Sequence, residues 1–136
     1  MGGANILNLP IGDNFADAVV ISDYNFGTNG VLAPPKGWLK GVRALCDKYG
    51  AKLLLDPSSV GLASVDVLPF ADIVVSSLTK YAGSEGDVMA GVIAVHPARA
   101  DGAEMLASVR RRLAPLHALD LAALATQVGR MAEVTQ

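Results

Sequence analysis

Cysteine is almost absent from this chain: its 136 residues contain one, Cys46. A single cysteine forms no internal disulfide and supplies no zinc-binding cysteine cluster, so a disulfide-stapled secreted domain and a zinc module are both excluded. We therefore expect a reducing, cytoplasmic location and no metal site. Cys46 falls on the apolar side of an expected helix, where it is interpreted as a small core residue.

Charge is also scarce, because charged residues make up 18% of the chain and the net charge is −2. The one cluster of basic residues, Arg110–Arg112, would point in three directions from a helix, and we interpret it as solvated charge. No apolar run is long enough to span a membrane, and no basic stretch followed by an apolar one opens the sequence. Neither nucleic acid nor a membrane is therefore an expected partner.

Apolar residues, in contrast, reach 51% of the chain, which predicts a large core or a surface that a partner covers. Continuous apolar runs predict strands, and apolar residues spaced by three and four predict helices. The layout is that of an α/β protein with a mostly parallel sheet flanked by helices on both faces. The expected strands are 17–22, 51–56, 72–76 and 87–95; the expected helices are 35–49, 97–113 and 119 to the end, with Gly50 closing the first.

The stretch SSLTKYAGSEGD, residues 76–87, places Lys80 just beyond an expected buried strand. Asp56 ends the strand before it, and functional residues of such sheets gather at the carboxyl ends of strands. A lysine held against apolar walls can form a Schiff base, and the hydroxyls of Ser77 and Thr79 beside glycine amides suit a phosphate. A carboxylate such as Asp56 can pair with a protonated ring nitrogen. Together these groups describe a pyridoxal phosphate site.

Each of these residues also has a plainer interpretation when it is taken alone. A single lysine is usually a solvated surface charge. Asp56 could be a strand-ending turn residue, and Ser77 and Thr79 could be ordinary loop hydroxyls. The order and spacing of the set favour the cofactor hypothesis.

Residues 71–95 resemble the lysine segment of the Cys/Met-metabolism pyridoxal-phosphate enzymes, which include cystathionine γ-synthase and the γ- and β-lyases. By that resemblance Lys80 is the Schiff-base lysine, Ser77 and Thr79 hold the phosphate, and Asp56 pairs with the pyridine nitrogen. Ser58 stands where the family has a threonine and would pack near the ring face. Independently of the resemblance, Asn25 and Asn29, which follow the first expected strand, are the candidates to bond the ring hydroxyl. The matching residues are Ala71–Val75, Ser77, Thr79–Tyr81, Gly83, Asp87, Val88 and Gly91.

Residues 30–56 instead resemble the class III aminotransferases, although Pro57 stands where those enzymes have glutamate. Both families belong to the fold-type I pyridoxal-phosphate enzymes, whose fold is that of aspartate aminotransferase. The two resemblances therefore imply one fold and one cofactor. Residues 1–136 are expected to be the central segment of the large cofactor-binding domain, without its amino-terminal part or the small carboxyl-terminal domain.

The resemblance implies an enzyme that acts on amino acids, with elimination or replacement on sulfur amino acids as the first expectation. Class III-like transamination is the alternative, and a non-catalytic fragment or interaction module is another. The chain could be a fragment, one chain of a split enzyme, or a small stand-alone protein, and alone it is expected to be inactive. Enzymes of this kind imply a homodimer or homotetramer, or a complementary chain if the enzyme is split.

Overall fold

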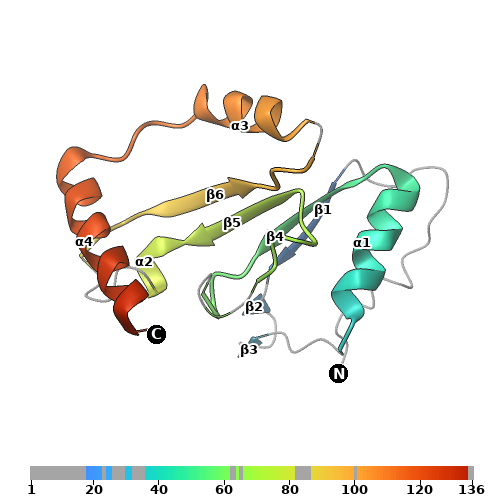
Figure 1. The fold of residues 1–136 in the computed structure, drawn as a ribbon, viewed down its shortest axis with the longest axis horizontal. Helices are drawn as coiled ribbons and strands as arrows, with labels where there is room; N and C mark the ends of the chain where they lie inside the picture. The colour runs from blue at the N-terminus through green and yellow to red at the C-terminus, as the bar shows by residue number, and fades with distance from the viewer. Residues whose placement is uncertain are drawn as a thin grey trace.

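The computed structural model describes residues 18–22, 24–25, 30–31, 36–61, 64, 66–81, 87–99 and 101–134. Figure 1 shows the arrangement of the helices and strands. The strands are β1 (Ala18–Ser22), β2 (Tyr24–Asn25), β3 (Gly30–Val31), β4 (Lys52–Asp56), β5 (Ile73–Ser77) and β6 (Gly91–Val95). The helices are α1 (Trp38–Tyr49), α2 (Leu78–Tyr81), α3 (Gly102–Arg110) and α4 (Ala118–Val134).

Among the described residues, the main sheet has the strand order β1-β4-β5-β6. β1, β4 and β5 run parallel to one another, and β6 runs antiparallel to β5. The prediction of a mostly parallel sheet is therefore confirmed. β2 and β3 form a separate antiparallel pair between β1 and α1, where the sequence predicts neither a strand nor a helix.

One face of the main sheet packs against α1. Val42 and Cys46 of the helix are fully buried, and they meet Leu53, Leu55 and Val74 of the sheet in one core cluster. Cys46 is thus the core residue that the helical spacing predicts. Tyr49, placed on the same face by that spacing, lies at the rim and is exposed.

Two glycines in the left-handed region bound α1. Gly37, with φ of 82°, precedes the first turn, so the helix begins at Trp38 and not at Pro35 as predicted. Gly50, with φ of 67°, is the predicted carboxyl cap. Its N–H donates to Asp47 and the next N–H donates to Cys46, the pair of bonds of a Schellman motif.

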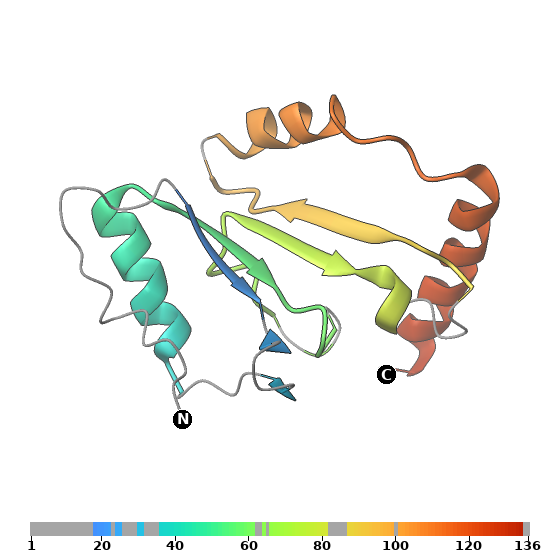
Figure 2. The ribbon, with the colours of Figure 1, turned by 180° about the vertical axis from the view of Figure 1, so that it is seen from behind.

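The opposite face of the sheet is open over β1, where Val20 is 67% exposed. In the part of the chain that the structure describes, this face of β1 therefore has no covering layer at Val20. α3 packs beside β6, and α4 lies at the far end of the sheet next to α2, as the views in Figures 1 and 2 agree. Val88 and Leu124 form a small second core there.

A buried carboxylate joins α1 to the sheet. Asp72, just before β5, accepts hydrogen bonds from the Leu53 N–H and the Arg43 guanidinium, both at 2.7 Å. Arg99 Nε lies 3.1 Å from the other carboxylate oxygen, at ion-pair distance. Burial alone would raise the pKa of Asp72, but the Leu53 hydrogen bond and the two arginines outweigh it and hold the pKa below its usual value. The cluster therefore ties three elements to one ionised group.

Two predicted elements begin later than expected. The helix predicted from Pro97 starts at Gly102, because Pro97–Arg99 form a turn in which the Arg99 N–H donates to His96. The strand predicted from Asp87 starts at Gly91, because the preceding residue, Ala90, is hydrogen-bonded to the start of α2.

Candidate functional site

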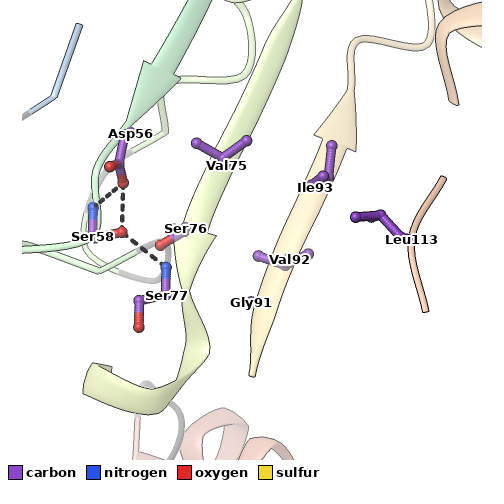
Figure 3. Close-up of a pocket in the computed structure, with 9 residues that line it drawn as sticks. All are labelled: Asp56, Ser58, Val75, Ser76, Ser77, Gly91, Val92, Ile93 and Leu113. Atoms are coloured by element: carbon purple, nitrogen blue, oxygen red, sulfur yellow. Dashed lines mark hydrogen bonds between the residues drawn. The ribbon is translucent and has the colours of Figure 1, made fainter. Parts of the chain in front are cut away.

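A pocket of about 420 Å³ lies where β4 and β5 end and the antiparallel β6 begins (Figure 3). The strand register places Ser77 opposite Gly91 and Val75 opposite Ile93, so these residues share one side of the sheet with Asp56. The walls are therefore apolar along the strands and polar at their carboxyl ends. The lining residues are Asp56, Ser58, Val75, Ser76, Ser77, Gly91, Val92, Ile93 and Leu113.

Asp56, Ser58 and Ser77 are joined by a chain of hydrogen bonds, drawn as dashed lines in Figure 3. The Ser58 N–H, at 3.1 Å, and the Ser58 hydroxyl both donate to the same carboxylate oxygen, Oδ1 of Asp56. The Ser58 hydroxyl in turn accepts the N–H of Ser77 at 2.8 Å. The other oxygen, Oδ2, accepts no hydrogen bond within the described part of the chain. The structure thus brings together three of the residues that the sequence predicts for the site.

Thr79 is engaged elsewhere. Its hydroxyl accepts the Ala90 N–H at 2.9 Å and lies 3.3 Å from the Ala90 carbonyl oxygen, to which it donates. The N–H groups of Leu78 and Thr79 donate to that same carbonyl. Thr79 therefore fastens the start of α2 to the residue before β6, and in this structure it does not line the pocket.

Lys80 lies on α2, directly after β5, and its side chain is exposed. It is not one of the residues that line the pocket. Asn25 lies in β2, and its side chain is outside the described residues. Gly83 of the matched segment is outside them as well.

Two contacts, one of them at the pocket, have no counterpart in the sequence analysis. Away from the pocket, the Gln127 amide of α4 donates to the Asp87 carboxylate at 2.8 Å, and the buried Gln127 carbonyl oxygen has no hydrogen-bond partner among the described residues. Leu113, which follows α3, reaches the pocket next to Ile93. Both contacts bring in residues from distant parts of the chain, so no local pattern could have revealed them.

The described residues hold no group of three or more histidine, cysteine or acidic side chains arranged to bind a metal ion. In the same residues, no helix has the length and apolar character to cross a bilayer. The Cys46 thiol is buried in the core below α1, and burial raises its pKa. A thiol in that state is poorly suited to act as a nucleophile.

Comparison with known proteins finds relatives that include cystathionine γ-synthase-like enzymes and aminotransferases, although no protein-family model matches the chain. Cystathionine γ-synthase of Saccharomyces cerevisiae is 39% identical over 61 residues, which are 45% of this chain and 10% of the relative. The omega-aminotransferase of Caulobacter vibrioides is 44% identical over 54 residues, which are 40% of this chain and 12% of the relative. The chain spans about a tenth of the length of the curated relatives that it matches.

Solved structures give a likeness over more of the chain. A taurine:2-oxoglutarate aminotransferase from Bifidobacterium kashiwanohense, in complex with PLP and glutamate, matches with a TM-score of 0.64 and 26% identity. The match covers 85% of this chain and 27% of that one. An aromatic amino acid β-eliminating lyase/threonine aldolase from Exiguobacterium shares the fold at a TM-score of 0.60 and 18% identity, over 86% of this chain and 34% of that one. The relatives of this chain thus include cystathionine γ-synthase-like enzymes and aminotransferases, and its fold is that of the fold-type I pyridoxal-phosphate enzymes, as the sequence predicts.

Proposed function

We propose that this chain is the central part of the cofactor-binding domain of a pyridoxal-phosphate-dependent enzyme that acts on amino acids. The observation that carries the proposal is the pocket at the carboxyl ends of β4 and β5, which Asp56 and Ser77 line together. The similarity to an aminotransferase in complex with PLP supports the choice of cofactor. When bound, pyridoxal phosphate supplies an electron sink for the bonds around the α-carbon of an amino acid.

The described residues suit one side of this cofactor. The volume of about 420 Å³ lies within the range of small-molecule sites, and Val75 and Ile93 offer apolar walls for a ring. No hydrogen bond from another described residue reaches Oδ2 of Asp56, and a carboxylate that pairs with a pyridine nitrogen needs such an oxygen. Ser77, at the end of β5, is placed to donate its hydroxyl to a phosphate. Ser58 and Asn25 complete the set of residues we propose for cofactor binding.

Lys80 is the residue we propose for covalent attachment and for moving the α-proton of the substrate. It lies three residues beyond Ser77, and its exposed side chain has four rotatable bonds with which to reach a cofactor. Thr79 fixes the backbone next to it through Ala90. We therefore propose that Thr79 contributes by holding the lysine segment as well as by any contact with the phosphate.

Borohydride treatment of the full-length protein with pyridoxal phosphate tests this proposal. We expect the cofactor to become covalently fixed to the peptide that contains Lys80, and the Lys80→Ala variant to lose this label. Lys36→Ala and Lys40→Ala are matched controls, since both lysines are exposed next to or on α1, away from the pocket. Labelling of Lys36 or Lys40 as readily as Lys80 would show nonspecific reaction, and a non-catalytic module would then be the better account.

The reaction we propose first is elimination or replacement on a sulfur amino acid, on the strength of the cystathionine γ-synthase-like relatives. Transamination is the second candidate, favoured by the aminotransferase relatives and structural neighbours. A panel of amino acids separates the two. Ammonia and a keto acid released from a single amino acid indicate elimination, whereas turnover that depends on an added 2-keto acid indicates transamination.

We propose that the working form is a cytoplasmic homodimer or homotetramer, or an assembly with a complementary chain. The open sheet face at Val20 supports a further covering surface. Light scattering on the active protein tests this, and a fully active monomer would contradict it.

A further inference from the structure

We infer that Ser58 contributes to cofactor binding as a positioning residue, which acts through the carboxylate of Asp56. This inference rests on the proposed function, because it names the residue that sets the Asp56 carboxylate for a ring nitrogen. It starts from the hydrogen bonds of the Ser58 hydroxyl, which faces Asp56 on one side and the Ser77 N–H on the other (Figure 3).

The direction of this chain of hydrogen bonds is fixed by chemistry. A hydroxyl has one proton, and a backbone N–H can only donate. The Ser77 N–H therefore donates to Ser58, and the Ser58 proton is given to the Asp56 carboxylate, which can only accept. Each donor polarises the next, so the two bonds strengthen one another in a half-buried setting.

The same hydroxyl connects residues that are distant in the sequence. Ser58 follows β4, whereas Ser77 ends β5, 19 residues later. The bond from the Ser58 N–H to Asp56 closes only a local turn after β4 and would survive loss of the hydroxyl. Beyond the pairing of β4 with β5 at Leu55 and Val74, the hydroxyl links the two strand ends through a side chain, and it thereby helps to set the spacing between the proposed ring-nitrogen partner and the proposed phosphate ligand.

The arrangement also decides which carboxylate oxygen is available. Both donors of Ser58 go to Oδ1, which restricts the rotation of the carboxylate, and among the described residues no donor occupies Oδ2. Without the hydroxyl, Asp56 keeps one local bond at Oδ1 and can rotate. A ring nitrogen would then pair with a less well-oriented acceptor. Ordering the carboxylate on binding would cost free energy and weaken the affinity for the cofactor.

Binding measurements with two probes test this inference. The probes are pyridoxal phosphate and its 1-deaza analogue, in which a carbon atom replaces the ring nitrogen, and the variants are Ser58→Ala and Ser58→Thr in the full-length protein. Ser64→Ala is the matched control, since Ser64 is an exposed serine in the loop after β4 that does not line the pocket. We expect Ser58→Ala to bind pyridoxal phosphate about tenfold more weakly, the effect of losing one hydrogen bond. Ser58→Thr and Ser64→Ala should bind as the parent protein does.

The 1-deaza analogue separates a role through Asp56 from a general structural role. If Ser58 acts through Asp56, the loss in Ser58→Ala should disappear with the analogue, which offers no ring nitrogen to the carboxylate. An equal loss with both probes, or no loss with either, would overturn the inference while leaving the proposed cofactor in place. If the parent protein binds neither probe, the proposed function fails and the inference fails with it.

Amide hydrogen exchange without any cofactor supplies an independent measurement. The Ser77 N–H should be protected in the parent protein and exchange faster in Ser58→Ala, because its acceptor is removed. Unchanged exchange at Ser77 would mean that the hydroxyl does not join the two strands, and this result would overturn the inference whatever the probes show.

Discussion

Removing the buried carboxylate of Asp72 should be the most destabilising single polar substitution in the described part of the chain. Its side chain is 4% exposed, and it accepts from the Leu53 N–H and from Arg43, whose side chain is itself 11% exposed. Asp72→Ala leaves the Leu53 N–H without its acceptor and removes the buried carboxylate partner of Arg43, which keeps the exposed Asp47 and two backbone carbonyls. Breaking a buried ion pair in this way costs about 3–5 kcal/mol of folding free energy. That is a large share of the roughly 5–15 kcal/mol by which a domain is stable.

Equilibrium unfolding in urea, followed by circular dichroism, measures this loss. Asp72→Asn should lose less than Asp72→Ala, because its amide oxygen can still accept the Leu53 N–H. Asp47→Ala is the matched control: Asp47 pairs with the same Arg43 at 2.7 Å but is 55% exposed, so its loss should stay below about 1 kcal/mol. If Asp72→Ala were as stable as Asp47→Ala, the buried cluster would contribute nothing and the reasoning would be refuted.

The same carboxylate predicts a dependence of stability on pH. The pKa of Asp72 is lowered in the folded chain below its ordinary value of 3.8, so its ionised form stabilises the fold at all pH values above that. This contribution falls away as the pH drops below 3.8 through the lower folded-state pKa. The stability difference between the parent protein and Asp72→Asn should therefore be constant near neutral pH and shrink only in strong acid. A difference that shrank already near pH 6 would contradict the assignment.

Two further predictions concern substitutions of Thr79 and the reactivity of the Cys46 thiol. Thr79→Val should lower the free energy of unfolding in urea by about 1–3 kcal/mol, because it leaves the Ala90 N–H without its acceptor. Thr79→Ser keeps the hydroxyl and should be about as stable as the parent protein. Equal losses of stability in both variants would contradict the role of the hydroxyl. The Cys46 thiol should not react with Ellman's reagent in the folded protein, because it is buried and burial raises its pKa. It should react fully after the protein is unfolded in guanidinium. Rapid reaction of the folded protein would show that the core below α1 is open.

The sequence predicts those parts of the fold that depend on local pattern. Helical spacing places Val42 and Cys46 on the buried face of α1, and the glycine at position 50 adopts the left-handed cap that its chemistry favours. Local pattern also predicts where the proposed site lies relative to the strands. An acidic residue directly after a continuous apolar run has to lie at the end of a strand, and Asp56 does.

The parts that could not be predicted depend on partners that are distant in the sequence. The residues that donate hydrogen bonds to Asp72 lie 19 and 29 positions away in the sequence, on two different elements. The residues next to Asp72 in the sequence therefore do not predict its partners. The run from Asp87 is apolar enough for a strand, yet pairing begins only at Gly91, because Thr79 engages Ala90. In both cases a side chain that forms a specific long-range hydrogen bond overrides what local composition favours.

Strand β5 is held at both of its ends by hydrogen bonds to other segments, and this has a consequence for Lys80. At the amino end, the Asp72 carboxylate accepts from Leu53, and the Asp72 carbonyl accepts from the His96 N–H. At the carboxyl end, the Ser77 N–H is bound by Ser58. A lysine has a long and flexible side chain, so its amine can be aimed reproducibly only if its backbone starts from a fixed point. The two anchors of β5 provide that point three residues before Lys80, and this is why substitutions of Asp72, far from the pocket, should weaken the borohydride labelling of Lys80 as well as the fold.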